Sequence, residues 1–221
     1  MDLFRIPSDR LEVVHHGIDS RFHPVPKAEA RRIVADRLNL RVPYFLHVGH
    51  LEKRKNVGRL LEAFYHFREE SKLDIKIAFS GARNFDTTFF DDVLTRYNLR
   101  PHVIELGETP NDCMAALYSA AELLSFPSLW EGFGFPVLES MACGTPVVTS
   151  NLSSLPEIAG DAAELVDPTR VEDIAAAMYR LATDSEAHRR ASERGLAQAA
   201  KFTWERAGAR TLDIYRKVLG Q

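Results

Sequence analysis

The stretch of sequence that decides the fold spans residues 128–146 and reads Ser-Leu-Trp-Glu-Gly-Phe-Gly-Phe-Pro-Val-Leu-Glu-Ser-Met-Ala-Cys-Gly-Thr-Pro. Pro136 is typical of the first position of a helix, and Gly144 of the position just past a helix end. Pro146 helps to prevent the helix from resuming. We therefore predict that a Gly-x-Gly loop leads directly into a short helix over residues 136–143. The backbone N–H groups at such a junction bind hydrogen-bond acceptors.

Apolar runs and amphipathic stretches alternate along the rest of the chain. Continuous apolar runs predict buried strands at 11–15, 44–48, 75–79, 103–106, 123–126 and 146–149, with a weaker one at 163–166. Helical patterns lie at 27–40, 57–72, 87–98, 112–120, 171–184, 185–201 and 204–219. This alternation predicts an α/β fold, a Rossmann-like doubly wound parallel sheet.

Glycines recur where the predicted strands end. Four strands are followed by Gly17, Gly49, Gly81 and Gly107, and a fifth by Phe126-Pro127-Ser128. Ligands of open parallel sheets bind outside the carboxyl ends of the strands, where glycine lets the backbone turn sharply and approach a ligand. These glycines could be ordinary turns, but their repetition favours a ligand-binding edge.

Composition limits the classes of function. The 221 residues, 45% hydrophobic and 27% charged, are enough for one large domain, and the net charge of −3 argues against nucleic acid as a partner. Cys113 and Cys143 fit no metal spacing and are interpreted as reduced thiols of a cytoplasmic protein. We expect no signal peptide, and no apolar run approaches the roughly 20 residues that span a bilayer. Any membrane contact is therefore expected to be peripheral, at the inner face.

Two glutamates flank the central loop, Glu131 before it and Glu139 about one turn into the predicted helix. An ionised carboxylate has only acceptors, so it pairs with hydroxyl donors, and its two oxygens can bridge a vicinal diol. Two carboxylates beside an anion-binding loop suit a ligand that is part diol and part anion, such as a nucleoside diphosphate sugar. Singly, each has a plainer interpretation: Glu139 could favour the positive end of a helix, and Glu131 could be a solvated loop residue.

A second candidate segment, Gly49-His-Leu-Glu-Lys-Arg-Lys-Asn56, joins a predicted strand to a predicted helix. Asn56 suits the N-cap of that helix, which places Arg54 and Lys55 at its positive end and predicts a phosphate site. The alternative is an ordinary solvated basic turn. The sequence has no P-loop, no complete dinucleotide fingerprint, no Asp-x-Asp metal pair and no nucleophile elbow. The adjacent His15 and His16 point to opposite faces of a predicted strand and are interpreted as structural.

Together these segments resemble the retaining glycosyltransferases of the GT-B fold, a large family that includes glycogen synthase, sucrose synthase and many bacterial mannosyl- and glucosyltransferases. The resemblance covers nearly the whole chain and rests on Val14–Asp19, the turn at 48–56, the Glu-x7-Glu spacing of 131–139, and the segments 153–163 and 202–205. It implies that residues 1–221 are the C-terminal, nucleotide-sugar-binding half of a GT-B fold, with residues 203–221 a helix that docks on an absent N-terminal domain.

The resemblance also implies roles for the matching residues. Lys55, with Arg54, would hold the diphosphate, and Glu131 would contact hydroxyls of the transferred sugar; Lys55 and Glu131 are thus the catalytic candidates. Glu139 would bind the ribose hydroxyls. The remaining contacts, with sugar, phosphates or base, fall on Gly132, Phe133, Gly134, Phe135, Gly107 and Thr109. His50 stands where the family often has arginine, which weakens the diphosphate clamp unless Arg54 compensates.

The implied activity is transfer of a hexosyl group, with mannosyl slightly favoured, from a GDP- or UDP-linked sugar to a glycan or lipid-linked acceptor. No cofactor and no metal are expected, and the chain is expected to be inactive without an N-terminal acceptor domain. Two alternatives stay open. The chain could be a non-catalytic nucleotide-sugar-binding module or subunit, or it could serve another GT-B chemistry, such as that of a sugar-nucleotide epimerase.

Overall fold

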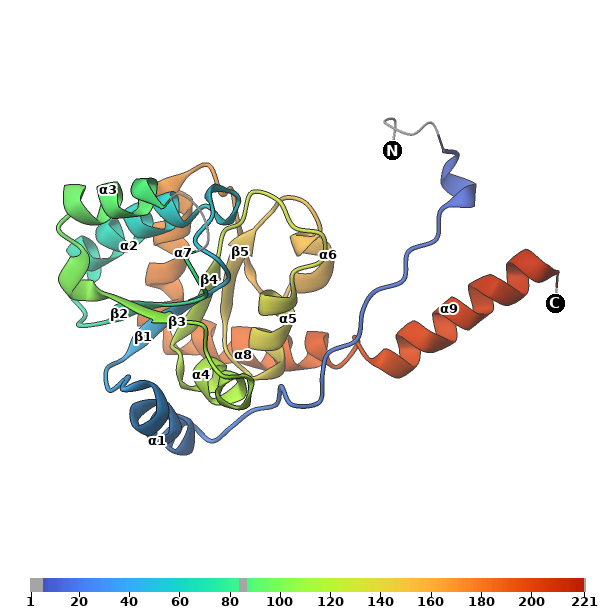
Figure 1. The fold of residues 1–221 in the computed structure, drawn as a ribbon, viewed down its shortest axis with the longest axis horizontal. Helices are drawn as coiled ribbons and strands as arrows, with labels where there is room; N and C mark the ends of the chain where they lie inside the picture. Colours follow the sequence, from blue (N-terminus) through green and yellow to red (C-terminus); the bar gives the residue numbers. More distant parts are fainter. Residues whose placement is uncertain (1–5, 84–86, 221) are drawn as a thin grey trace.

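The computed structural model describes residues 6–83 and 87–220, which form a parallel sheet with helices on both faces (Figure 1). Within this part of the chain the sheet has six strands in the order β3-β2-β1-β4-β5-β6. They are β1 Tyr44–Val48, β2 Lys76–Ser80, β3 Val103–Gly107, β4 Leu123–Phe126, β5 Val147–Ser150 and β6 Glu164–Val166. The prediction of a Rossmann-like, doubly wound α/β fold is therefore confirmed.

The helices cover the two faces of the sheet in two groups. One group contains α1 Lys27–Leu38, α4 Met114–Ala120, α5 Phe135–Ala142 and α6 Leu155–Ala159, and the other contains α2 Val57–Ser71, α3 Thr88–Arg96 and α7 Val171–Thr183. Side chains alternate across β4: Leu124 and Phe126 pack with the first group, and Leu123 with the second. Both faces of the strand are buried, which explains the continuous apolar runs in the sequence.

The prediction of a strand at 11–15 is wrong. These residues pair with no strand in the described chain, and Leu11 and Val13 are 41% and 64% exposed. The segment is instead an extended arm beside α9 Trp204–Leu219, where Ile18 N–H donates to the Phe202 carbonyl at 3.0 Å. A short apolar run predicts a strand only if a neighbouring strand can pair with it, and here none does.

Gly17 consequently ends no strand. A Cβ at this position would lie 2.2 Å from the backbone nitrogen of Trp204, so the glycine allows the arm and the start of α9 to cross closely. The glycines that follow β1 and β2, Gly49 and Gly81, and Gly107 at the end of β3 do have positive φ angles at the carboxyl edge. The expected edge glycines are therefore three, not four.

Several helix ends differ from the prediction by one or two residues. α5 begins at Phe135, so Pro136 holds the second helical position and not the first. α6, a helix of five residues, has no counterpart in the prediction because it is too short to show a helical period. α8 Ser185–Ala199 packs against α5 and α7.

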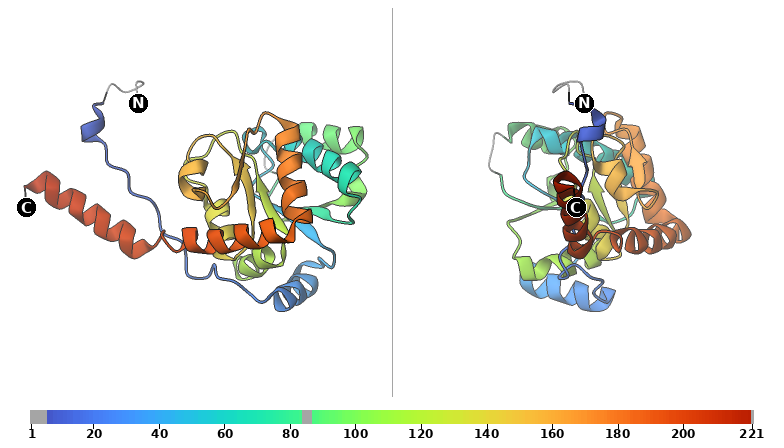
Figure 2. Two further views of the ribbon diagram at one scale, coloured as in Figure 1. Left: turned by 180° about the vertical axis from the view of Figure 1, so that it is seen from behind. Right: turned by 90° about the vertical axis from the view of Figure 1, so that its right-hand side faces the viewer.

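α9 and the N-terminal arm project together from the body of the sheet (Figures 1 and 2). No residue of α9 is buried, and Trp204, Leu212 and Tyr215 are 52%, 48% and 63% exposed. The structure describes residues 203–220 of the predicted docking helix at 203–221. That this helix docks on another domain stays a prediction. None of the described helices combines the length and apolar character that crossing a bilayer requires.

Candidate functional site

The site begins at the point where the strand order reverses. β1 and β4 are neighbours, but the chain continues outward from them in opposite directions, to β2 and β3 on one side and to β5 and β6 on the other. Open α/β sheets bind ligands in the crevice at such a switch point. The loop after β1 carries Arg54 and Lys55, and the loop after β4 carries Glu131.

These two loops meet through an ion-pair cluster. Lys55 Nζ donates to Glu131 Oε1 at 2.7 Å, and Arg54 Nη1 lies 3.1 Å from Glu131 Oε2. The Lys55 and Glu131 side chains are only 11% and 10% exposed. Lys55 Nζ also lies 4.6 Å from the centroid of the Phe126 ring, at the end of β4. The basic turn and the first glutamate therefore converge on one edge of the sheet.

Charge pairing dominates the environment of Glu131. Burial raises the pKa of its carboxyl, but the hydrogen bond and the charge of Lys55, together with the charge of Arg54, outweigh burial and leave the pKa below its ordinary value. Arg54 also donates to the Trp130 carbonyl at 2.7 Å. Glu131 is thus an ionised carboxylate that has only acceptors to offer.

Asn56 stands at the N-cap position of α2, as predicted, but it does not cap the helix with its side chain. Its backbone is left-handed, with φ 60°, and its side chain makes no cap hydrogen bond. The amide Nδ2 instead donates to the carbonyls of Pro127 at 3.0 Å and Pro168 at 2.6 Å. Asn56 therefore fastens the basic turn to the loops that follow β4 and β6, which fixes the position of Lys55 beside it.

The loop at 131–134 is held by two serines that the site prediction did not include. Glu131 N–H donates to Ser153 Oγ at 3.0 Å, and Ser154 Oγ donates to the Phe133 carbonyl at 2.8 Å. Gly134 has φ 112°, and a Cβ there would lie 2.7 Å from Leu155 Cδ2. These contacts fix the backbone between Glu131 and Glu139, which includes the exposed Gly132 and the start of α5.

The aromatic rings of this loop face the N-terminal arm. Phe133 and Phe135 lie 5.0 Å and 5.5 Å, centroid to centroid, from the ring of His16. His15 Nε2 lies 2.8 Å from Glu157 Oε1. Both histidines thus have structural contacts, which agrees with their interpretation as structural residues. Across the described chain, no three His, Cys, Asp or Glu side chains gather as a metal site.

Glu139 lies at a second cluster of polar side chains. Tyr118 Oη donates to Glu139 Oε2 at 2.6 Å. Burial raises the pKa of the Glu139 carboxyl above its ordinary value, although the Tyr118 hydrogen bond and the charge of Arg21 act to lower it. Neither Tyr118 nor Arg21 was predicted as a site residue. Their only sequence signals are one hydroxyl in the apolar stretch 114–118 and one cation two residues after Asp19.

The remaining candidates lie along the ends of β1 to β3. Gly81 N–H donates to the Gly107 carbonyl at 2.8 Å, and Ser80 Oγ donates to Thr109 Oγ1 at 2.8 Å. The exposed His50 has its Nδ1 3.7 Å from Glu52 Oε1. The structure therefore places Gly107 and Thr109 on the same carboxyl edge as the basic turn, but farther along the sheet.

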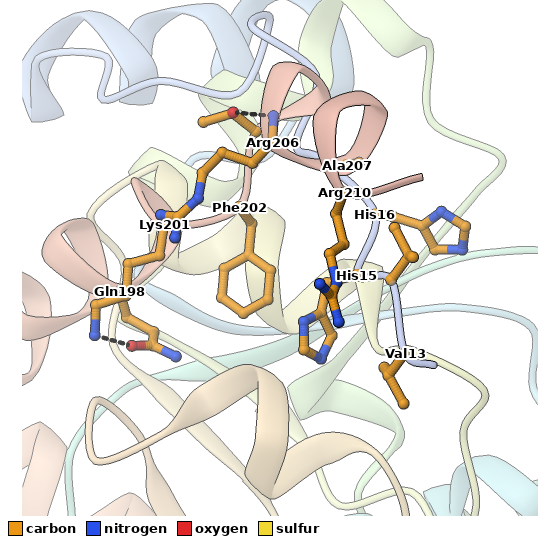
Figure 3. Close-up of a pocket in the computed structure, with 11 residues that line it drawn as sticks. Val13, His15, His16, Gln198, Lys201, Phe202, Arg206, Ala207 and Arg210 are labelled. Atoms are coloured by element: carbon orange, nitrogen blue, oxygen red, sulfur yellow. Dashed lines mark hydrogen bonds between the residues drawn. The ribbon is translucent and has the colours of Figure 1, made fainter. Parts of the chain in front are cut away.

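A cavity of about 410 Å³ lies away from this edge, where the arm meets the end of α8 and the start of α9 (Figure 3). Figure 3 shows His15, Lys201, Phe202 and Arg206 around it. Lys201 Nζ donates to Gln198 Oε1 at 2.8 Å. This cavity owes its shape to the projecting arm and α9, and its lining includes none of the residues predicted to bind a donor.

Comparison with known proteins agrees with the resemblance in the sequence. The model of the family described as "Glycosyl transferases group 1" matches residues 31–198. The O-antigen chain mannosyltransferase B of Escherichia coli is 34% identical over 214 residues, which are 97% of this chain and 56% of that protein. The chain thus spans about half the length of this relative, and only 27% of the serotype-specific mannosyltransferase WbdA of Escherichia coli, to which it is 31% identical.

Solved structures share the fold. Sucrose-phosphate synthase from Thermosynechococcus elongatus superposes with a TM-score of 0.79 and 26% identity, over 95% of this chain and 53% of that one. The C-terminal domain of a glycosyl transferase group 1 family protein from Francisella tularensis superposes with a TM-score of 0.72 and 23% identity. The match covers 84% of this chain and 97% of that one, and it concerns the fold alone.

Proposed function

The chain belongs to the glycosyl transferases group 1 family, and we propose that it is the donor-binding half of a retaining hexosyltransferase. The donor would be a nucleoside diphosphate sugar, linked to GDP or UDP, and the acceptor a glycan or a lipid-linked glycan. The observation that carries the proposal is the meeting of Lys55 and Arg54 with Glu131 at the switch point between β1 and β4.

Each part of the site suits one part of such a donor. Lys55 and Arg54 would bind the diphosphate and stabilise its charge as the bond to the sugar breaks, and preorganised charge of this kind usually contributes most to catalysis. Glu131, which is ionised and held in place by those cations, would accept hydrogen bonds from sugar hydroxyls. The backbone N–H groups at 133–135 would contact the sugar or the phosphates.

The far end of the donor would lie along the other candidates. Glu139 would accept hydrogen bonds from the ribose hydroxyls, and Gly107 and Thr109 would lie beside the base. His50 would add a weak contribution to the diphosphate site, because Glu52 lies next to it. A mannosyl donor is favoured, since mannosyltransferases are among the relatives that this chain matches over nearly its full length.

Turnover would require a second domain that supplies the acceptor site, because the chain spans about half the length of its relatives or less. The exposed apolar side chains of α9 would dock on that domain. We place the enzyme in the cytoplasm, with any membrane contact peripheral. A chain that binds a donor but never transfers sugar, even with an acceptor domain, would be a binding module; conversion of the donor to an epimer would indicate epimerase chemistry.

The test is calorimetric titration of the chain with GDP, UDP and GDP-mannose, beside a transfer assay. Lys55→Ala removes a charge-assisted hydrogen-bond donor and is expected to weaken diphosphate binding by about tenfold or more. Lys53→Ala is the matched control, because Lys53 lies in the same turn but is exposed to solvent. Its effect should stay within about twofold, as is usual for a surface charge. If Lys55→Ala and Lys53→Ala bind equally well, Lys55 does not hold the diphosphate.

A further inference from the structure

Glu139 is contacted by a hydroxyl from a different helix. Tyr118 lies in α4, is fully buried, and donates its Oη proton to Glu139 Oε2 at 2.6 Å. The ring of Tyr118 also packs edge-to-face on Phe22, with centroids 5.9 Å apart. Two elements, α4 and the segment that precedes α1, therefore fix this one phenol group beside the glutamate of α5.

The hydrogen bond matters because burial opposes the charge of Glu139. A neutral carboxylic acid is a weaker hydrogen-bond acceptor than a carboxylate, so protonation of Glu139 would weaken its hold on a diol. Burial raises the pKa of Tyr118 well above its ordinary value, so its hydroxyl stays protonated and always has a proton to donate. Donation of that proton stabilises the ionised form of Glu139 and fixes the direction of Oε2.

The other charged groups around Glu139 act on the stability of its carboxylate in opposite directions. The charge of Arg21 stabilises the carboxylate and that of Asp19 opposes it, and the two are paired with each other at 2.6 Å between Nη2 and Oδ2. Cys143, at the end of the same helix, has its pKa raised to about 12 by burial and is therefore a neutral thiol. Since Arg21 and Asp19 largely offset each other, the Tyr118 hydroxyl is the main support for the charge.

We propose that Tyr118 is a positioning residue for the nucleotide, which holds the Glu139 carboxylate ionised and oriented so that it accepts the vicinal hydroxyls of the ribose. This inference rests on the proposed function, because the ribose belongs to the nucleoside diphosphate of the donor. Tyr118 itself does not touch the ligand: Oε2 accepts from Tyr118, and Oε1 is the oxygen we assign to the diol.

The experiment compares affinities for two probes. GDP or UDP, whichever the unmodified chain binds more tightly, is titrated beside its 2′,3′-dideoxy counterpart over a series of pH values. The unmodified chain should prefer the hydroxylated nucleotide by roughly tenfold at neutral pH, as expected for hydrogen bonds to a charged group. Tyr118→Phe should lose most of that preference at neutral pH. As the pH is lowered, the remaining preference should disappear at a higher pH than in the unmodified chain, because Glu139 protonates more easily without the Tyr118 hydrogen bond.

Tyr44→Phe is the matched control. Tyr44 is also buried, and its hydroxyl donates at 2.7 Å to the backbone carbonyl of Leu117 and not to a carboxylate. This variant should change the melting temperature without changing the preference for hydroxylated nucleotide. A double-mutant cycle adds a second criterion: in a Glu139→Gln background, Tyr118→Phe should cause no further loss, because Tyr118 acts only through that carboxylate.

The outcomes distinguish a failure of the proposed function from a failure of the role assigned to Tyr118. If the unmodified chain binds neither nucleotide, the proposed function fails and this inference fails with it. If it binds with a clear preference for the ribose hydroxyls and Tyr118→Phe keeps that preference, only the role of Tyr118 is overturned. Should Tyr118→Phe not fold, 3-fluorotyrosine in place of Tyr118 retains the hydroxyl as a stronger donor. It should move the acid limb of the ribose preference to lower pH, and an unmoved limb would overturn the proposal.

Discussion

Acidification should destabilise this domain through one histidine beneath the candidate site. His47 lies in β1, is fully buried, and has its ring between those of Phe79 and Phe126, at centroid distances of 5.4 and 5.6 Å. Its Nδ1 lies 3.0 Å from the Ser125 carbonyl, and its Nε2 is buried with no hydrogen-bond partner among the described residues. Burial lowers the pKa of His47 to about 4.

The sign and size of the effect follow from that pKa. The imidazole binds a proton near pH 6.5 in the unfolded chain but only near pH 4 in the folded one, so the unfolded state is favoured as pH falls between these values. At about 1.4 kcal/mol per pH unit, the full loss of stability is roughly 3 to 4 kcal/mol. Between pH 7.5 and 4.5 we expect His47 to account for a loss of roughly 2 to 3 kcal/mol.

The assay is urea unfolding of the unmodified chain and of His47→Asn at several pH values from 7.5 to 4.5. Asn keeps an N–H donor near the position of Nδ1 but does not titrate, so the difference in unfolding free energy between the two proteins isolates the imidazole. That difference should shift by roughly 2 to 3 kcal/mol across the series. His66→Asn, on the exposed face of α2, should follow the unmodified chain. A difference that stays constant with pH would refute the reasoning.

Three further predictions concern the edge of the sheet and the arm. Gly81→Ala puts a Cβ 2.1 Å from the Gly49 carbonyl at φ 150°, and should lower the unfolding free energy by about 2 kcal/mol or more in the same urea assay. Gly17→Ala cannot fit beside the backbone of Trp204, and should speed amide hydrogen exchange at Ile18; unchanged protection would contradict this. Glu131→Gln should keep its affinity for GDP but lose the additional affinity that the sugar gives to GDP-mannose. Lys55→Ala should instead lose affinity for the diphosphate that both ligands share, and titration of each variant with both ligands would show the difference.

Much of the fold is predictable from the sequence because buried parallel strands are continuous apolar runs. The runs at 44–48, 123–126 and 103–106 agree with β1, β4 and β3 to within one residue. The run at 11–15 has the same local pattern and yet forms no strand, because pairing depends on a neighbour that local sequence does not specify. The boundaries of α1 and α8 fall two residues short of the prediction, since helix ends depend on tertiary contacts as well as on propensity.

The candidate site is predictable to the extent that it follows from strand ends. The loops that carry Lys55 and Glu131 are 76 residues apart, but both follow parallel strands, so both must lie at one edge of the sheet. Tyr118 gives no such signal, because it approaches Glu139 from the middle of a buried helix. Asn56 stands at the predicted N-cap position, but its side chain does not cap α2, because its left-handed backbone directs the amide towards loops that only the folded chain brings near.

The Lys55–Glu131 pair is better explained by ligand binding than by stability. Both side chains are about nine-tenths buried, and removing two charges from water costs several kcal/mol per ion before their attraction offsets it. Replacing such a pair with apolar side chains is often neutral or stabilising. Arg54 Nη2 also lies 3.4 Å from Glu52 Oε2, so the cluster holds two cations and two carboxylates. A diphosphate bound by Lys55 and Arg54 would replace part of this pairing, and Glu131, kept ionised by the same cations, would remain an acceptor for the sugar.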